Sequence, residues 1–206
     1  MPVYKKNIIN NDSILLIWKI EEDYPALMNS LELSKESIDK IHSFSSDKRK
    51  VEFLSTRKLL REAGYSDTDL TYNSDGAPLL INSNISISHT RNYVAVFISS
   101  DRVGVDLERK REQLFRISHK FINKAEEKIF DTASLEMLSI LWSCKEAMFK
   151  LCKRAGIDFK ENLMVTKVDI ENKILEGEIL FDDLKTKVKG SLDIFDNHTL
   201  VYLMND

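Results

Sequence analysis

The sequence predicts an α+β fold made of two halves, and three observations point to it. Short, apolar, branched segments typical of buried strands occur in both parts of the chain, for example Ile14–Ile20 and Tyr93–Ser99. Helical and strand patterns fall in separate runs within each half, which favours antiparallel sheets covered by helices. The 206 residues suffice for two cores, and no linker rich in Pro, Gly or Ser separates them. We therefore expect an N-terminal half over residues 1–102 and a C-terminal half over residues 103–206.

In the N-terminal half, two helices should follow the first strand. Ser34 can cap a helix that runs toward Phe44, and Ser46 or Asp47 can cap a longer one that ends at Gly64. Alternating or continuous apolar patterns then predict strands at 85–88 and 93–99, and a further strand at 103–108, where the C-terminal half begins. The Asp101-Arg102 pair lies between the last two and is short enough for a hairpin, although it lacks the preferred Gly or Asn.

In the C-terminal half, two further helices and four strands are expected. Asn123 can cap a helix through Asp131, and Ser134 can cap a long helix that ends near Gly156. Strand patterns follow at 163–170, 174–181, 188–195 and 199–204.

Composition excludes several classes of protein. Hydrophobic residues make up 43% and charged residues 31%, as in an ordinary folded domain. A net charge of −3 gives no general attraction to nucleic acid. No apolar run approaches the ~20 residues of a membrane span, and the first residues lack the apolar core of a signal peptide. Cys144 and Cys152 fit no zinc pattern and are too far apart on one helix to bridge, so a cytoplasmic protein is expected.

Two segments carry residues suited to phosphate chemistry. Asp106 and Glu108 stand two positions apart in the strand 103–108, so they point to the same face. Glu146 and Lys150 lie one turn apart on the expected long helix. Hard oxygen ligands suit Mg²⁺, and Mg²⁺ together with a lysine suits a phosphate. The structural alternatives are an exposed strand end and a surface ion pair worth about 0.2–0.5 kcal/mol.

The same segments resemble motifs of the 4′-phosphopantetheinyl transferase superfamily, in particular the type that activates non-ribosomal peptide synthetases. Residues 104–108 resemble the family's G-[IV]-D-x-E, and residues 142–150 resemble W-[ST]-x-K-E-[AS]-x-x-K at every fixed position. Residues 121–126 resemble F-F-[ST]-x-x-E, with Ile and Asn at the second and third places, and Ser88-His89-Thr90 resembles S-H-[ST]. A lone D-x-E would be a weak signal, but the four motifs occur in the family's order.

The resemblance implies a fold and an activity. The halves are expected to be related α+β copies, packed as a pseudo-dimer with the active site between them. The activity would be transfer of the phosphopantetheine arm of coenzyme A to a serine of an apo acyl, peptidyl or polyketide carrier protein. The transfer would depend on Mg²⁺ and would release adenosine 3′,5′-bisphosphate. We expect a monomer that binds neither nucleic acid nor membrane.

The resemblance also implies roles for individual residues. Three carboxylates would hold Mg²⁺, and Lys150, with Lys145 less clearly, would contact phosphate. The serine proton would pass to Glu146, Glu126 or a metal-bound water. Ser88 and His89 would contact the 3′-phosphate. Because Ala77 stands where the family often has lysine, Arg49, Lys50 or Arg57 would carry more of that contact. The expected metal ligands are Asp106, Glu108 and Glu146.

Two other function classes use a similar residue set. A Mg²⁺-dependent phosphohydrolase could use the D-x-E strand with a distant Glu, but it would not need the 142–150 motif. A non-catalytic module that binds coenzyme A or a carrier protein could keep the fold, but intact carboxylates and Lys150 argue against an inactive site.

Basic residues follow the D-x-E strand, and we expect Arg111, Arg116 and Lys120 to face an acidic carrier protein.

Overall fold

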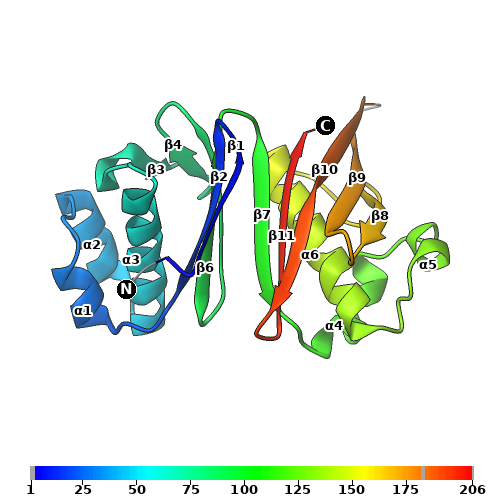
Figure 1. Ribbon diagram of the computed structural model, residues 1–206, viewed down its shortest axis with the longest axis horizontal. Coiled ribbons are helices and arrows are strands. Elements are labelled where there is room, and N and C mark those ends of the chain that lie inside the picture. The colour runs from blue at the N-terminus through cyan, green and yellow to red at the C-terminus, as the bar shows by residue number, and fades with distance from the viewer. Residues whose placement is uncertain (1–2, 182–183, 206) are drawn as a thin grey trace. The chain divides into compact units, whose positions relative to one another are not determined.

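The computed structural model describes residues 3–181 and 184–205, and it divides the chain into two units, Met1–Ser100 and Asp101–Asp206. Each unit combines antiparallel sheet with helices, so the predicted α+β class is confirmed (Figure 1). The boundary expected after residue 102 lies two residues beyond the division at Ser100. The relation of the halves as copies of one another stays a prediction.

The first unit is built on a four-stranded sheet in the order β1-β2-β6-β5. Buried side chains of β2, β6 and the long helix α3, among them Leu16, Leu60 and Val96, form the core between sheet and helix. Two shorter helices and a small β3-β4 sheet complete the unit. Its elements are β1 (Lys5–Asn10), β2 (Ser13–Lys19), α1 (Tyr24–Asn29), α2 (Lys35–Ser43), α3 (Asp47–Glu62), η1 (Asp67–Asp69), β3 (Leu70–Tyr72), β4 (Pro78–Leu80), β5 (Asn84–His89) and β6 (Tyr93–Ser99).

Both predicted helices of this unit are confirmed, and their ends follow from local chemistry. The Ser34 hydroxyl accepts a hydrogen bond from the Ser37 amide at 3.1 Å, which satisfies one free donor at the start of α2. Gly64 follows the end of α3 with a φ of +89°, a conformation that glycine adopts without strain.

The second unit is built on a five-stranded sheet in the order β7-β11-β10-β9-β8. The long helix α6 packs against β7, β11 and β8, and the core lies between helix and sheet. Figure 1 shows α6 along one face of this sheet, with α4 and α5 near one end of it. The elements are β7 (Val103–Arg109), α4 (Gln113–Ile117), η2 (Ser118–Lys120), α5 (Glu126–Ile129), α6 (Leu135–Cys152), β8 (Leu163–Asp169), β9 (Ile174–Phe181), β10 (Leu184–Phe195) and β11 (His198–Asn205).

Gly104 allows an unusually close approach between β7 and α6. A Cβ atom at this position would lie 1.9 Å from the carbonyl oxygen of Ala147 and 3.2 Å from Cβ of Leu151. Any side chain at residue 104 would therefore push strand and helix apart. The approach brings the carboxylates of β7 next to the charged face of α6.

Two sequence predictions about local structure were wrong. The hairpin at Asp101-Arg102 does not form, because β6 pairs with β2 and β5 while β7 pairs with β11 in a different sheet. The helix expected from Asn123 to Asp131 is only the single turn α5. The Asn123 side-chain oxygen accepts hydrogen bonds from the amides of Ala125 and Glu126, both at 2.9 Å, and so forms a local turn in place of a longer helix.

Cys144 and Cys152 are free and buried. Among the residues that the structure describes, no helix is both long and apolar enough to cross a membrane.

Candidate active site

Strand β7 carries the two carboxylates that the sequence singled out. Asp106 lies opposite Val201 in the ladder with β11 and is buried, whereas Glu108 lies opposite Thr199 and is half-buried. Because side chains alternate along a strand, Asp106 and Glu108 share one face. That face is the one that α6 covers.

Helix α6 brings Lys150 directly to this strand. Its ammonium donates hydrogen bonds to Oδ1 of Asp106 at 2.9 Å and to the backbone oxygen of Val105 at 3.0 Å. The Lys150 side chain is 27% exposed, so the ion pair lies at the border between core and solvent. Lysine and aspartate, distant in the sequence, therefore meet as predicted.

The negative charge of Asp106 acts on both Glu108 and Glu146. The pKa of Glu146 is raised to about 7, mainly by burial and next by the charge of Asp106, while Lys150 partly offsets both. Burial also raises the pKa of Glu108, with Asp106 as the second cause and Arg111 opposing. The Trp142 indole N–H lies close enough to lower the Glu108 pKa slightly, without the geometry of a full hydrogen bond. The carboxylates of Asp106, Glu108 and Glu146 therefore lie close together in a partly buried region beside Lys150, and we call these four residues the charged cluster.

A divalent cation suits this donor set. Within residues 3–181 and 184–205, no three Asp, Glu, His or Cys side chains are already arranged to hold a metal ion. Instead, the Lys150 ammonium provides the positive charge beside Asp106. Burial, and next the charge of Asp106, raise the pKa values of Glu108 and Glu146, and a bound cation would oppose both effects. Mg²⁺ prefers carboxylate oxygen, so Asp106, Glu108 and Glu146 are the residues that would hold it.

Glu126 and Lys145 lie elsewhere, and their placement corrects the roles expected for them. Both side chains are fully buried and pair with each other at 2.7 Å. Burial lowers the pKa of Lys145, and the Glu126 charge opposes that shift. A carboxylate without solvent access cannot take a proton from a substrate hydroxyl, and a buried ammonium cannot reach a phosphate. In this structure neither side chain is accessible to a substrate.

A comparison with models of known families matches residues 102–195 to the 4′-phosphopantetheinyl transferase superfamily. The second unit is a domain of this superfamily. The matched segment contains β7, α6 and all four residues of the charged cluster. Membership indicates a transferase that moves phosphopantetheinyl groups, in a family that generally uses coenzyme A, carrier proteins and a divalent metal. A comparison with curated proteins found no match.

The phosphopantetheinyl transferase match begins after the first unit, which has a pocket of its own. This pocket has a volume of about 640 Å³ and is lined by residues of α2, α3, β5 and the loop after β3, among them Lys40, Arg49 and His89. The buried Glu52 carboxylate lies beneath, with Oε2 3.5 Å from Nδ1 of His89 and Oε1 3.4 Å from the Lys48 ammonium. Two of the predicted phosphate contacts, Arg49 and His89, are therefore brought together.

The other residues expected at a phosphate lie outside this pocket. Arg57 is buried and donates to Oδ1 of Asp67 at 2.8 Å, and its guanidinium carbon lies 4.0 Å from the ring centre of Phe53. Its charge is therefore already paired within the first unit. Ser88 is buried in β5. Lys50 pairs with Asp47 at 2.9 Å. No sequence signal pointed to Glu52, since a glutamate on a charged helix face is usually solvated.

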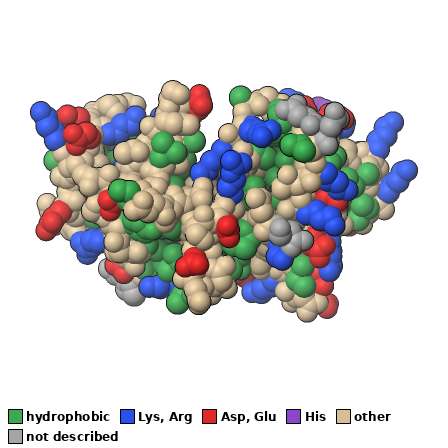
Figure 2. All heavy atoms as spheres, turned by 90° about the horizontal axis from the view of Figure 1, so that it is seen from above, with side chains coloured by type: hydrophobic (Ala, Val, Ile, Leu, Met, Phe, Trp, Pro, Cys, Tyr) green, Lys and Arg blue, Asp and Glu red, His purple; other side chains and the backbone are tan. Residues whose placement is uncertain are grey.

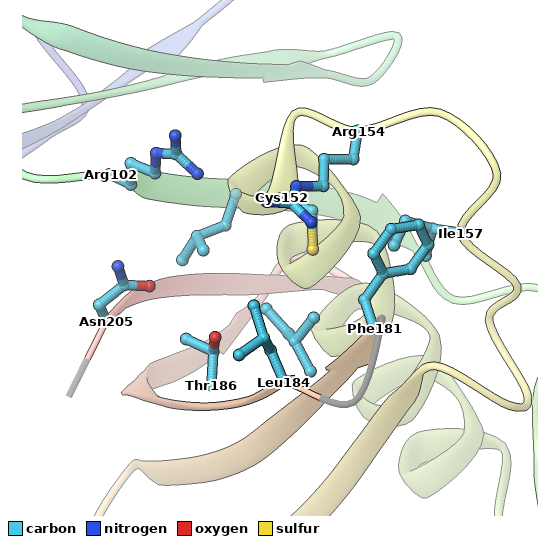
Figure 3. A pocket seen from close by; sticks show the side chains of 10 residues that line it. Arg102, Cys152, Arg154, Ile157, Phe181, Leu184, Thr186 and Asn205 are labelled. Atoms are coloured by element: carbon cyan, nitrogen blue, oxygen red, sulfur yellow. The ribbon is translucent and has the colours of Figure 1, made fainter.

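A small pocket of about 110 Å³ lies at the C-terminal end of α6 and contains none of the predicted site residues (Figure 3). Its arginines, Arg102 and Arg154, are exposed, and the Arg154 guanidinium lies 5.4 Å from the Phe181 ring centre. Burial raises the pKa of the Cys152 thiol, which disfavours a reactive thiolate there.

The residues expected to meet a carrier protein are at the surface of the second unit. Arg116 and Lys120 are exposed on α4 and η2, next to the exposed ring of Phe115. Arg111 is also exposed and lies 3.6 Å from Glu108. On the face of the molecule drawn in Figure 2, basic side chains are interspersed with acidic ones.

Proposed function

We propose that the protein transfers the 4′-phosphopantetheine arm of coenzyme A to a serine of an apo acyl or peptidyl carrier protein, with Mg²⁺ as the metal. Adenosine 3′,5′-bisphosphate is the second product. The proposal rests above all on one observation: Asp106, Glu108, Glu146 and Lys150 converge in a half-buried cluster inside a phosphopantetheinyl transferase domain.

The reaction makes one bond to phosphorus and breaks another. The serine oxygen attacks the phosphorus that carries the pantetheine, and the phosphoanhydride bond to the oxygen of the nucleotide breaks. Negative charge grows on that leaving oxygen, and when Mg²⁺ is bound it supplies charge neutralisation there. Lys150 has a mobile ammonium that can move from Asp106 to the pyrophosphate as a point charge.

The serine proton needs an acceptor at neutral pH. Glu126 is buried, which leaves Glu146, acting directly or through a bound water, as the side chain of choice. The pKa of about 7 belongs to Glu146 without metal, and bound Mg²⁺ would lower it, which favours passage of the proton through a bound water.

The nucleotide part of coenzyme A suits the pocket of the first unit. Lys40, Arg49 and His89 line it and can bind a phosphate, which compensates for Ala77 in place of lysine. The carrier protein suits the exposed basic residues Arg111, Arg116 and Lys120, since carrier proteins of this class are acidic. We further propose a cytoplasmic monomer of the type that serves peptide synthetases.

Incubation with coenzyme A, Mg²⁺ and an apo carrier protein, followed by intact-mass measurement, tests the proposal. We expect each carrier to gain one phosphopantetheine, and no gain when Mg²⁺ is replaced by a chelator. Breakdown of coenzyme A without modification of the carrier would favour a phosphohydrolase. Binding of coenzyme A with no reaction at all would favour a non-catalytic module.

A further inference from the structure

The buried pair of Lys145 and Glu126 makes contacts that extend beyond the pair itself. Both side chains are 0% exposed, and Nζ of Lys145 lies 2.7 Å from Oε2 of Glu126. Lys145 directly precedes Glu146 on α6. A buried ion pair is rarely a net source of stability, because removing two charges from water costs about as much as their attraction returns.

Lys145 fixes two backbone segments outside α6. Its ammonium also donates to the carbonyl oxygens of Phe121 at 2.6 Å and of Phe159 at 2.9 Å. The rings of these same two residues pack on Trp142, with ring centres 5.1 Å and 5.6 Å away. Lys145 therefore fixes the two backbone segments whose rings, Phe121 and Phe159, pack against the Trp142 indole.

Glu126 fixes two further segments. Its Oε1 accepts from the amide of Val165 in β8 at 2.9 Å, and its Oε2 accepts from the amide of Asn123 at 3.0 Å. The network joins α6, α5, β8 and the two flanking loops. Because both carboxylate oxygens and the ammonium are all engaged by protein partners, the network favours one geometry.

Trp142 connects this network to the charged cluster. It lies one turn before Glu146 on α6, and its indole N–H approaches Glu108. A shift of Phe121 or Phe159 would let the indole move, and Glu108 and Glu146 would then lose their present spacing.

We propose that Lys145 and Glu126 are positioning residues, which set the geometry of the three carboxylates through Trp142 and through their own place on α6. The inference rests on the proposed function, because it assigns the cluster to metal binding and transfer. Residues that orient metal ligands from behind typically change metal affinity or activity about 10- to 100-fold when they are replaced.

The test variant removes both charges together. Lys145→Met with Glu126→Gln keeps similar volumes and removes the buried ion pair without leaving one charge unpaired. The matched control is Ser139→Ala with Thr199→Val, which removes a buried 3.0 Å hydrogen bond between the same helix and β11. The control loosens α6 without touching Phe121, Phe159 or Trp142.

Three readouts separate positioning from folding. They are kcat and KM for coenzyme A, Mn²⁺ affinity by calorimetry without substrate, and the emission of Trp142 in a Trp18→Phe background, since the chain has two tryptophans. We expect the test variant to lose roughly tenfold in kcat and in Mn²⁺ affinity, with KM for coenzyme A unchanged within about twofold. Its Trp142 emission should shift, while the control keeps wild-type values in all three.

Several results would overturn the inference. Equal losses in test and control variants would mean a merely structural role, and wild-type kcat with wild-type Mn²⁺ affinity in the test variant would mean no role. If the test variant does not fold, Trp142→Phe replaces it, because it leaves the buried pair intact and removes only the indole between the pair and Glu108; wild-type kcat and Mn²⁺ affinity in that variant would count against the inference. Absence of transfer by the wild-type protein would reject the proposed function, while Mn²⁺ affinity and Trp142 emission would still decide on positioning.

Discussion

The two units present their functional side chains in different ways. In the first unit, Arg49 and His89 line an open pocket that a loop and two helices help to form, and His89 is 53% exposed. In the second unit, Asp106 and Glu146 stand on a strand and a helix whose backbones nearly touch at Gly104. Sites built on regular elements are held more accurately than sites on loops. This difference fits the proposed function, in which the first unit binds coenzyme A and the second unit carries out the step that needs accurate geometry.

Replacement of Asp106 should have the largest effect and tests the second unit's role most directly. Asp106→Ala should lower kcat/KM about a thousandfold, because it removes the partner of Lys150 and, under the proposed function, a ligand of Mg²⁺. Steady-state kinetics with circular dichroism as a check on folding measures this. The Asp106 and Glu108 double variant should cost less than the sum of the single ones. Turnover like that of the wild type in Asp106→Ala would contradict the metal assignment.

Replacement of Lys150 should cost less, because it contributes one point charge. Lys150→Met keeps helix propensity and length, and we expect a loss of about 10- to 100-fold in kcat. Binding of coenzyme A should weaken, whereas binding of an analogue without the pyrophosphate should not. Equal weakening for both compounds would show that Lys150 is not a phosphate contact.

The pocket of the first unit should respond in KM and not in kcat. Arg49→Ala with His89→Ala should raise KM for coenzyme A about tenfold, a loss typical of charged hydrogen bonds, and should leave kcat within about twofold. The ratio of the two effects measures how far binding and chemistry are divided between the units. A comparable fall in kcat would remove that division.

The raised pKa of Glu146 predicts a stability cost that depends on pH. Between its ordinary value of 4.5 and about 7, the unfolded chain ionises this group before the folded one does, so stability is lost as pH rises across that window. Glu146→Gln should therefore raise the free energy of unfolding at pH 8 without metal by about 1–2 kcal/mol, allowing for partial exposure. Urea unfolding at about pH 8 and about pH 4, on either side of the ordinary and raised pKa values, measures it. An equal gain at both pH values would rule out the ionisation of Glu146 as the source of the cost.

Charge reversal at Arg116 and Lys120 should have the smallest effect. Rim charges act mainly on association rate, so we expect KM for the carrier protein to rise a few-fold and its salt dependence to flatten. KM for coenzyme A should not change, and a parallel rise of both constants would mean that the carrier binds elsewhere.

The residues of the charged cluster could be predicted from the sequence because the repeat of a strand and the repeat of a helix each place two of them on one face. Alternation along β7 places Asp106 with Glu108, and the helical repeat places Glu146 with Lys150. The meeting of strand and helix came only from the family motifs.

Lys145 shows where sequence reasoning went wrong and which signal was overlooked. Each residue of an α-helix is turned by about 100° from the one before, so Lys145 does not share the face of Glu146. It falls in line with Leu141, Met148 and Cys152, an apolar stripe that marks the core side of α6. The pairing of Lys145 with Glu126 could not be predicted, since a contact between different elements leaves no period in the sequence.

Strand β7 has one sheet neighbour, β11, in the described part of the chain, and this arrangement has a consequence in time. Asp106 pairs with Val201, so the ribosome must add almost all of the second unit before the carboxylate strand can dock. At synthesis rates of about 5–20 residues per second, about 5 to 20 seconds pass between the synthesis of β7 and the synthesis of β11, the strand with which it pairs. During that interval the side chains of Val103, Val105 and Leu107, which are buried in the folded unit, lack the strand that pairs with β7, and exposed apolar segments of this kind are prone to aggregation.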